Sequence, residues 1–317
     1  MDHEALRARR DQRRRAVRRR AQFLGLIAVA AIAAIAIAAM SGGATHRSPA
    51  SAPTQAHAGG SSAASSSTPT TTSATRHPGT EPVPILMYHV IAAPPAGAPF
   101  PGLYVPPAEF AEQMQALKDA GWHAVTLDQV RSHWTAGTPL GPGKPIVLTF
   151  DNGYQSQFTQ ALPVLRRLGW VGNENIQLSG LPPSQGGLGE GQVRAMVAAG
   201  WELDTQGFSH ADLITLGPER LHYEVAVTRS VLQRRYHVPV NWFCYPSGHY
   251  DPTVIAEVKA AGYAGSTTVV PGWAHPSDDA YRLHRLRVLG GTSGRALLEQ
   301  VASSREAPPA PVSYKGG

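Results

Sequence analysis

Cysteine is almost missing from this sequence: of its 317 residues only Cys244 is one. A single cysteine excludes an intramolecular disulfide framework and a cysteine-rich zinc site. Charged residues are also sparse, at 16%, whereas 42% of the residues are hydrophobic. A chain this apolar has enough side-chain surface to bury in a core, so the composition excludes disorder along its whole length.

Excess basic charge is missing from residues 21–317, the body of the chain. Residues 1–20 carry nine arginines and three acidic residues, which accounts for the whole formal net charge of +6. The remaining residues hold 19 basic and 19 acidic side chains and are neutral. We therefore expect no nucleic-acid partner for the body. No expected strand is followed by G-x-G-x-x-G and no G-x-x-x-x-G-K-[ST] occurs, which disfavours a nucleotide enzyme.

Residues 23–40 form a run of 18 residues without a charge or a proline. As a helix this run would be about 27 Å long, just enough to cross a hydrocarbon core of roughly 30 Å. Arginine-rich flanks stay in the cytoplasm. We therefore predict a basic cytoplasmic tail (1–20), a single membrane anchor (21–40) and an extracytoplasmic C-terminal domain. The alternative is a cleaved signal peptide, with Ala36 and Ala38 at the cleavage site, which would make the protein secreted.

Residues 41–82 are almost entirely small or polar. Of these 42 residues, 35 are Ser, Thr, Ala, Gly or Pro. Such a segment has little to bury, so we predict a disordered linker that holds the following domain away from the bilayer. The domain itself is expected at 83–304, and residues 305–317 are expected to be a frayed tail.

Within 83–304 one pattern recurs four times: an amphipathic helical stretch, a glycine, an aromatic residue and a short strand. The four glycines are expected at helix C-termini, where left-handed backbone is needed; they are Gly121, Gly169, Gly200 and Gly262. Helices that alternate with short apolar strands predict βα units and a mainly parallel sheet.

Eight strands are expected in this domain, at 85–89, 124–127, 146–150, 175–178, 202–205, 242–245, 265–268 and 286–289. Seven or eight βα units in about 220 residues favour an α/β fold of the distorted (β/α) barrel type. An open doubly wound sheet is the alternative, because strand order cannot be read from one sequence. In a barrel, active sites lie at the C-terminal ends of the strands.

Four segments in the same order resemble the polysaccharide deacetylase family (the NodB-type homology domain, carbohydrate esterase family 4). Residues 149–154 read TFDNGY and resemble its TFDDGY motif. Residues 84–90 (PILMYHV), 200–213 (GWELDTQGFSHADL) and 243–250 (FCYPSGHY) resemble three further family segments, and 283–288 (LHRLRV) a late one. The resemblance spans most of 83–290 and implies a distorted barrel of about seven strands.

The resemblance also implies chemistry. Members remove acetyl groups from N-acetylated sugars, and a metal ion, usually zinc, polarises the amide and activates a water. By motif position Asp151 is the catalytic base, and the backbone N–H of Ser247 helps to stabilise the oxyanion. The positions of the metal ligands are Asn152, Gln206 and His210. Substrate binding is assigned to Tyr154, Tyr245 and His249.

Two of the three ligand positions depart from the family, since Asn152 replaces an aspartate and Gln206 a histidine. The loss of a carboxylate and an imidazole should weaken zinc binding by several kcal/mol, because structural zinc sites gain about 10–16 kcal/mol from four ligands. Asp204 lies two residues before Gln206 on the same expected strand, so both point the same way. We therefore consider Asp204, with Asp151 and His210, as a replacement set for zinc or another divalent metal.

These observations predict a membrane-tethered hydrolase that acts on the acetamido C–N bonds of N-acetylated cell-envelope glycans. The alternative is a glycan-binding module that has lost its metal site. Each residue also has a structural interpretation: Asp-Asn-Gly is a good turn sequence, Gln206 and His210 could cap backbone groups, His89 could be a hydrogen-bonded barrel residue, and Cys244 an inert buried thiol.

Overall fold

The computed structural model describes residues 77–181 and 186–316. The predicted cytoplasmic tail, the membrane anchor and the linker up to residue 76 lie outside the described residues. Within the described ranges, no helix combines the length and the apolar character that crossing a membrane requires. The predicted membrane anchor therefore stays a prediction.

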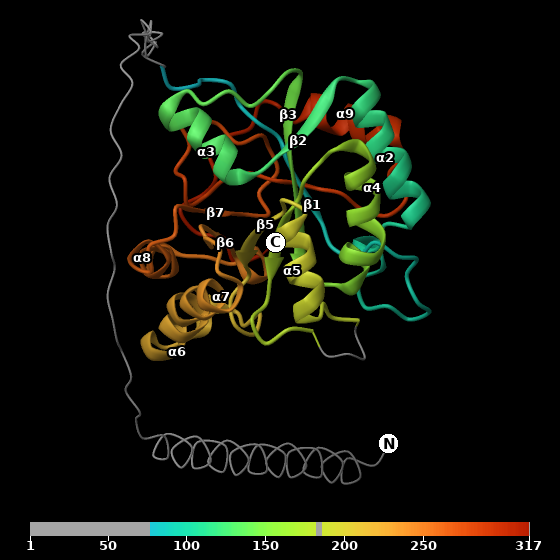
Figure 1. The fold of residues 1–317 in the computed structure, drawn as a ribbon. Helices are drawn as coiled ribbons and strands as arrows, with labels where there is room; N and C mark the ends of the chain where they lie inside the picture. The colour runs from blue at the N-terminus through green and yellow to red at the C-terminus, as the bar shows by residue number, and fades with distance from the viewer. Residues whose placement is uncertain (1–76, 182–185, 317) are drawn as a thin grey trace, which may run out of the picture. The chain divides into compact units, whose positions relative to one another are not determined.

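Eight parallel strands form one sheet (Figure 1). They are β1 (Ile85–Tyr88), β2 (Trp122–Val125), β3 (Lys144–Asn152), β4 (Asn173–Ile176), β5 (Glu202–Thr205), β6 (Trp242–Cys244), β7 (Gly265–Thr267) and β8 (Leu286–Arg287). All eight strands expected from the sequence are present, with bounds that differ by at most two residues at either end. The predicted α/β class with a parallel sheet is therefore confirmed.

The sheet is a curled half-barrel. Seven strands follow one another in the order β7-β6-β5-β4-β3-β1-β8, and β2 pairs separately with the first half of the long strand β3. No continuous ladder joins β7 to β8 in the described residues; Thr267 of β7 forms an isolated bridge with Leu283, which lies before β8. The predicted number of strands is correct, but the ring is not closed by regular pairing.

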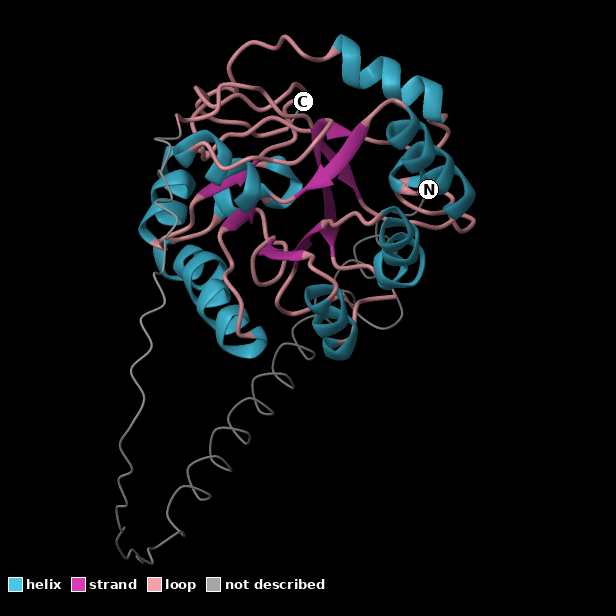
Figure 2. Ribbon diagram, turned by 45° about the horizontal axis from the view of Figure 1, so that its top comes forward, coloured by secondary structure: helices cyan, strands magenta, loops and turns pink. Residues whose placement is uncertain are grey.

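Helices cover the outside of the curled sheet (Figure 2). The longer ones are α2 (Pro107–Asp119), α3 (Leu127–Ala136), α4 (Leu162–Leu168), α5 (Glu190–Ala198), α6 (Pro218–His222), α7 (Thr228–Tyr236), α8 (Pro252–Ala260) and α9 (Gly294–Ser303). The four repeat glycines have φ values of 81°, 70°, 89° and 80° at or just after the ends of α2, α4, α5 and α8. This left-handed backbone explains the recurring glycine.

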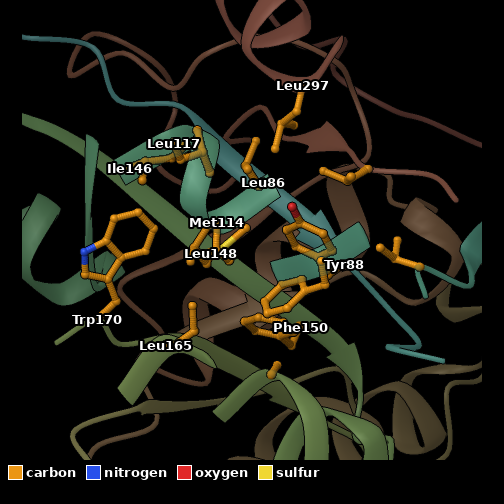
Figure 3. Packing of buried hydrophobic residues seen from close by; sticks show 14 of the residues in the cluster. Leu86, Tyr88, Met114, Leu117, Ile146, Leu148, Phe150, Leu165, Trp170 and Leu297 are labelled. Atoms are coloured by element: carbon orange, nitrogen blue, oxygen red, sulfur yellow. The ribbon is translucent and has the colours of Figure 1, made fainter. Parts of the chain in front are cut away.

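Alternate residues of the central strands form the outer core (Figure 3). Leu86 and Tyr88 of β1 lie beside Leu148 and Phe150 of β3, and all are fully buried against α2, α4 and α9. The rings of Tyr88 and Phe150 stack with centroids 5.6 Å apart. Because side chains alternate along a strand, the residues between these point into the barrel.

The inner face changes from apolar to polar along the strands. Near their N-terminal ends, Ile85, Val147 and Trp242 pack with Leu127 and Val130 of α3. Further along, the inward positions are polar and buried; they include Thr149, Asp151, Asn173, Asn175 and Asp204. The apolar end closes the barrel from below, and the polar end leads to the strand termini where a site is expected.

The C-terminal segment is docked onto the domain, so the prediction of a frayed tail is wrong for its described residues. Tyr314 and Tyr250 exchange backbone hydrogen bonds of 2.8 and 2.9 Å. The Tyr250 hydroxyl donates to the Pro311 carbonyl at 2.9 Å, and Arg282 donates to that of Ala310 at 2.8 Å. The small and polar side chains of this segment predicted a frayed tail, but its contacts are made mainly by backbone atoms, which the side-chain composition does not reveal.

Candidate active site

A cavity of about 420 Å³ lies at the C-terminal ends of β1, β3, β5 and β6. Its walls bring together most of the residues singled out from the sequence. The lining residues are Met87, His89, Phe100, Leu103, Asp151, Asn152, Tyr154, Gln206, His210, Tyr245, Ser247, Gly248, Val269, Arg285 and Arg287. Asp151 and His210, which are 59 positions apart in the sequence, therefore share one hollow.

Asp151 is held by a bidentate ion pair. Arg285 donates Nη1 to Oδ1 at 2.8 Å and Nη2 to Oδ2 at 3.0 Å, and the two side chains are only 1% and 2% exposed. Asn175 donates to Oδ1 at 2.8 Å, and the Cys244 thiol lies 3.5 Å from Oδ2. Both carboxylate oxygens are thus engaged, which fixes the orientation of the group.

The pKa of Asp151 is decided by these partners. Burial by itself would raise it, but the charges of Arg285 and His89 and the hydrogen bonds from Arg285 and Asn175 outweigh burial and lower the pKa to about 2. The Arg285 pKa is raised by the same carboxylate. The pair is therefore fully ionised at neutral pH.

Two histidines in the cavity are neutral at that pH. Burial, opposed by Asp151 and assisted by Arg285, lowers the pKa of His89 to about 4. The His89 Nε2 atom lies 4.0 Å from Asp151 Oδ2, and its Nδ1 atom is buried without a hydrogen-bond partner. Burial also lowers the pKa of His210. Neutral imidazoles can accept a proton or a hydrogen bond from a ligand.

Backbone strain is concentrated at this cavity. Four non-glycine residues in the described ranges have positive φ, and three of them line the cavity: Asn152 at 79°, His210 at 57° and Ser247 at 56°. Asparagine tolerates this region well, whereas serine does so less readily. Ser247 is exposed at the centre of the short turn Pro246–Gly248 after β6 and is one of the residues that line the cavity. Such conformations cost about 1–3 kcal/mol and cluster at ligand sites.

The residues at the ligand positions do not fit zinc. Asn152 and Gln206 offer neutral amide oxygens and His210 one imidazole, whereas zinc sites are built from thiolates, imidazoles and carboxylates. The one lining carboxylate, Asp151, already has both oxygens engaged by Arg285. Across the described residues, no group of three or more His, Cys, Asp or Glu side chains is placed to hold a metal.

Asp204 does not reach the cavity, so the structure gives no support to its role as a replacement ligand. It is fully buried deeper in the barrel, where it accepts hydrogen bonds from Asn173 at 3.2 Å and from the Trp242 backbone at 3.0 Å. Burial raises its pKa to about 7 despite these bonds. Gln206, which directly follows β5, lines the cavity, whereas Asp204 within β5 does not.

The three predicted substrate residues have different positions. Tyr154 is half-buried and lines the cavity, whereas Tyr245 is almost fully buried in its wall and donates its hydroxyl to the Tyr281 carbonyl at 3.0 Å. His249 is not a lining residue; its Nδ1 atom lies 3.1 Å from Asp212 Oδ1. Tyr154 is therefore the one with an accessible surface for a ligand.

Sequence reasoning missed the partner of Asp151 and the mouth of the cavity. Arg285 lies within the late segment 283–288, but nothing in that segment shows that its side chain reaches Asp151, 134 positions away. Asn175 pairs in register with Asp151 from β4, a relation that only strand order reveals. Phe100, in the loop after β1, carried no signal at all.

Comparisons with known proteins agree with this geometry. The family model for polysaccharide deacetylase matches residues 140–266. A Bacillus subtilis (strain 168) protein named as polysaccharide deacetylase YxkH is 29% identical over 224 residues, 70% of this chain and 77% of that protein. The poly-beta-1,6-N-acetyl-D-glucosamine N-deacetylase of Escherichia coli (strain K12) is 42% identical over 59 residues, which are 19% of this chain and 9% of that protein.

Solved structures give the same result. The Streptococcus pyogenes deacetylase PplD, solved with acetate, is 26% identical and superposes with a TM-score of 0.64 over 70% of this chain and 99% of that one. A polysaccharide deacetylase from Bacillus cereus is 25% identical, with a TM-score of 0.62 over 70% of this chain and 69% of that one. In its fold, its motif order and the cavity at its strand ends, this chain is similar to the polysaccharide deacetylases, the family whose model matches residues 140–266.

Proposed function

We propose that this protein binds N-acetylated polysaccharide by taking the acetamido group of one sugar into the cavity at the strand ends. The observation that carries the proposal is Gln206 Oε1, an acceptor that is buried without a hydrogen-bond partner. Leaving such an atom unsatisfied costs about 1–3 kcal/mol, so a ligand donor that reaches it gains that much. An acetamido N–H is a donor of this kind.

Other lining residues complement the rest of the sugar. The exposed turn at Ser247 offers a backbone N–H at the position where the family stabilises the acetyl oxygen. Phe100 is 69% exposed at the cavity and offers an apolar face to a pyranose ring. The relatives named above as deacetylases of polysaccharides support this class of ligand.

Hydrolysis of the acetamido bond is the second candidate function, with Asp151 as the base. It is favoured by the retained carboxylate, which is ionised and held in the same cavity as His210. A base with a pKa of about 2 takes a proton from water only if the water is strongly activated, however, and the residues present do not fit the zinc ion that would do this. The geometry therefore supports glycan binding more strongly than turnover.

The test uses the full-length chain in detergent. Calorimetry with chitotetraose should detect binding, and Gln206→Leu should weaken it about five- to twentyfold because the unsatisfied acceptor is gone. Gln115→Leu, a change on an exposed face of α2, should leave binding unchanged. A chain that binds no N-acetylated oligosaccharide contradicts the proposal.

Acetate release separates the two functions. The unaltered chain should release little or no acetate, with or without added zinc. The double variant Asn152→Asp, Gln206→His restores an Asp-His-His set and should gain both zinc and turnover, and the further change Asp151→Asn should abolish that turnover. Substantial acetate release by the unaltered chain, lost on Asp151→Asn, would establish the hydrolase instead.

The location of the protein also belongs to this proposal. We propose that the domain is tethered outside the cytoplasmic membrane and that its glycan belongs to the cell envelope. The uncharged run at 23–40, behind nine arginines, supports this orientation. Protease added to intact cells should remove the domain if it is exported and leave it intact if it is not.

A further inference from the structure

The charges that line the cavity do not cancel. Of its fifteen lining residues, only Asp151, Arg285 and Arg287 carry a full charge at neutral pH, since burial keeps His89 and His210 neutral. Asp151 and Arg285 neutralise each other in the bidentate pair. One positive charge, that of Arg287, is left over.

Arg287 is placed to offer this charge to a ligand. It is exposed, whereas its neighbours in the chain, Leu286 and Val288, are buried at 1% and 0%. In the described parts of the chain its guanidinium has no ion pair and no hydrogen bond to a carboxylate or carbonyl. Arg285 lies two residues earlier, just before β8, and differs in being 1% exposed and fully engaged. Residues 285–287 thus supply one buried arginine that pairs with Asp151 and one exposed arginine at the cavity.

Phe100 lies on the wall of the same cavity. It is 69% exposed, the highest value among the large hydrophobic side chains in the described ranges. Its loop is fixed on both sides, because Val90 and Tyr104 pair as parallel bridge partners and Gly290, close to Arg287, donates to the Gly102 carbonyl at 3.0 Å. An apolar ring face and a guanidinium around one hollow suit a sugar ring that carries an acid group.

We infer that the polysaccharide bound by this protein is acidic, and that Arg287 pairs with a carboxylate on a sugar ring that packs against Phe100. The inference rests on the proposed function, since it assigns the substituent of the glycan that enters the same cavity. The guanidinium matches a carboxylate in a planar, bidentate way that a neutral hydroxyl cannot reproduce. A neutral N-acetylated polymer offers Arg287 no counter-charge.

Three tetrasaccharides with the same β-1,4 backbone test this inference on the full-length chain. They are chitotetraose, the alternating tetrasaccharide of N-acetylglucosamine and N-acetylmuramic acid, and that tetrasaccharide with its lactyl carboxyls methyl-esterified. The acidic form should bind about tenfold more tightly than either neutral form at low salt, and the advantage should shrink at high salt. The ester keeps the bulk of the lactyl group, so it separates charge from shape.

Variants locate the effect. Arg287→Gln should remove the preference, so that the acidic tetrasaccharide binds no more tightly than chitotetraose to this variant, whereas Arg287→Lys should retain part of the preference. Arg295→Gln, which changes an exposed arginine on α9 outside the cavity, should leave the preference unchanged. Equal binding of all three sugars, or a preference that survives in Arg287→Gln, overturns this inference alone. A failure of all three sugars to bind overturns the proposed function as well.

Discussion

Asp151 and Asp204 occupy the same inward-facing row of the sheet, since both pair in register with Asn175 of β4. Both are buried, with exposures of 1% and 0%, yet their pKa values are moved in opposite directions, to about 2 and about 7. Asp151 faces a guanidinium, whereas Asp204 has only amide partners and the nearby carboxyl of Glu202. The comparison shows that a fixed positive charge, and not depth, decides whether a buried carboxyl is ionised here.

The two regions also differ in what closes them. Around Asp204, α3 seals the barrel: Asp128 accepts from the Trp242 indole at 3.1 Å and from Asn241 at 2.7 Å. Around Asp151 the barrel opens into the cavity. The ionised, oriented carboxylate therefore lies where a ligand can approach, and the carboxyl with the raised pKa lies where none can.

The largest expected effect comes from breaking the ion pair. Arg285→Met should lower the free energy of unfolding by about 3–5 kcal/mol, because it leaves the Asp151 carboxylate buried without its counter-charge. The pKa of Asp151 should then rise. Urea denaturation followed by circular dichroism measures the loss, and Arg295→Met, at a side chain that is 87% exposed, is the matched control with an effect within about 0.5 kcal/mol. A loss below 1 kcal/mol in Arg285→Met would mean that the pair does not hold this region together.

A smaller, pH-dependent effect on the free energy of unfolding is expected at the Asp204 carboxyl. The folded-state pKa of Asp204 is raised from 3.8 to about 7, so its contribution to stability is complete below about pH 4 and is lost as the pH rises to about 7. Asp204→Asn removes this loss. Between pH 4 and pH 8 the free energy of unfolding of the variant should therefore rise by up to about 4 kcal/mol relative to that of the unaltered chain.

Urea midpoints at four or five pH values test this prediction. Gln115→Leu, which changes an exposed side chain on α2 that carries no titratable group, is the control, and its midpoints should run parallel to those of the unaltered chain. Parallel curves for Asp204→Asn as well would show that Asp204 is ionised in the folded state, and the contrast with Asp151 would disappear.

The smallest effect is expected where the C-terminal segment docks onto the domain. Tyr250→Phe removes the hydroxyl that donates to Pro311 and should cost about 1 kcal/mol. Amide exchange should become faster at Tyr314, whose pairing with Tyr250 holds the C-terminal segment, and stay unchanged in α3. Unchanged exchange at Tyr314 would show that the segment is held without this hydroxyl.

Local sequence signals were sufficient for the elements of the fold. The glycine after each amphipathic stretch predicted where a helix ends, and the short apolar runs predicted the strands. Both features depend on backbone conformation within a few residues. The site could be predicted in part: Asp151, Gln206 and His210 do line one cavity. The docking of residues around Pro311 and Tyr314 could not, since it depends on backbone hydrogen bonds to a distant loop.

What the sequence by itself determined is the resemblance to polysaccharide deacetylases, the parallel α/β architecture and the departure from the family motif at two positions, because motifs, periodicity and residue chemistry are local properties. Only the tertiary structure decided the state of each group. In the folded chain Arg285 pairs with Asp151, Asp204 lies outside the cavity lining, and Arg287 lines the cavity. The pKa of a buried carboxyl depends on charges within a few ångströms, and which charges those are is set by how distant strands curl around one another.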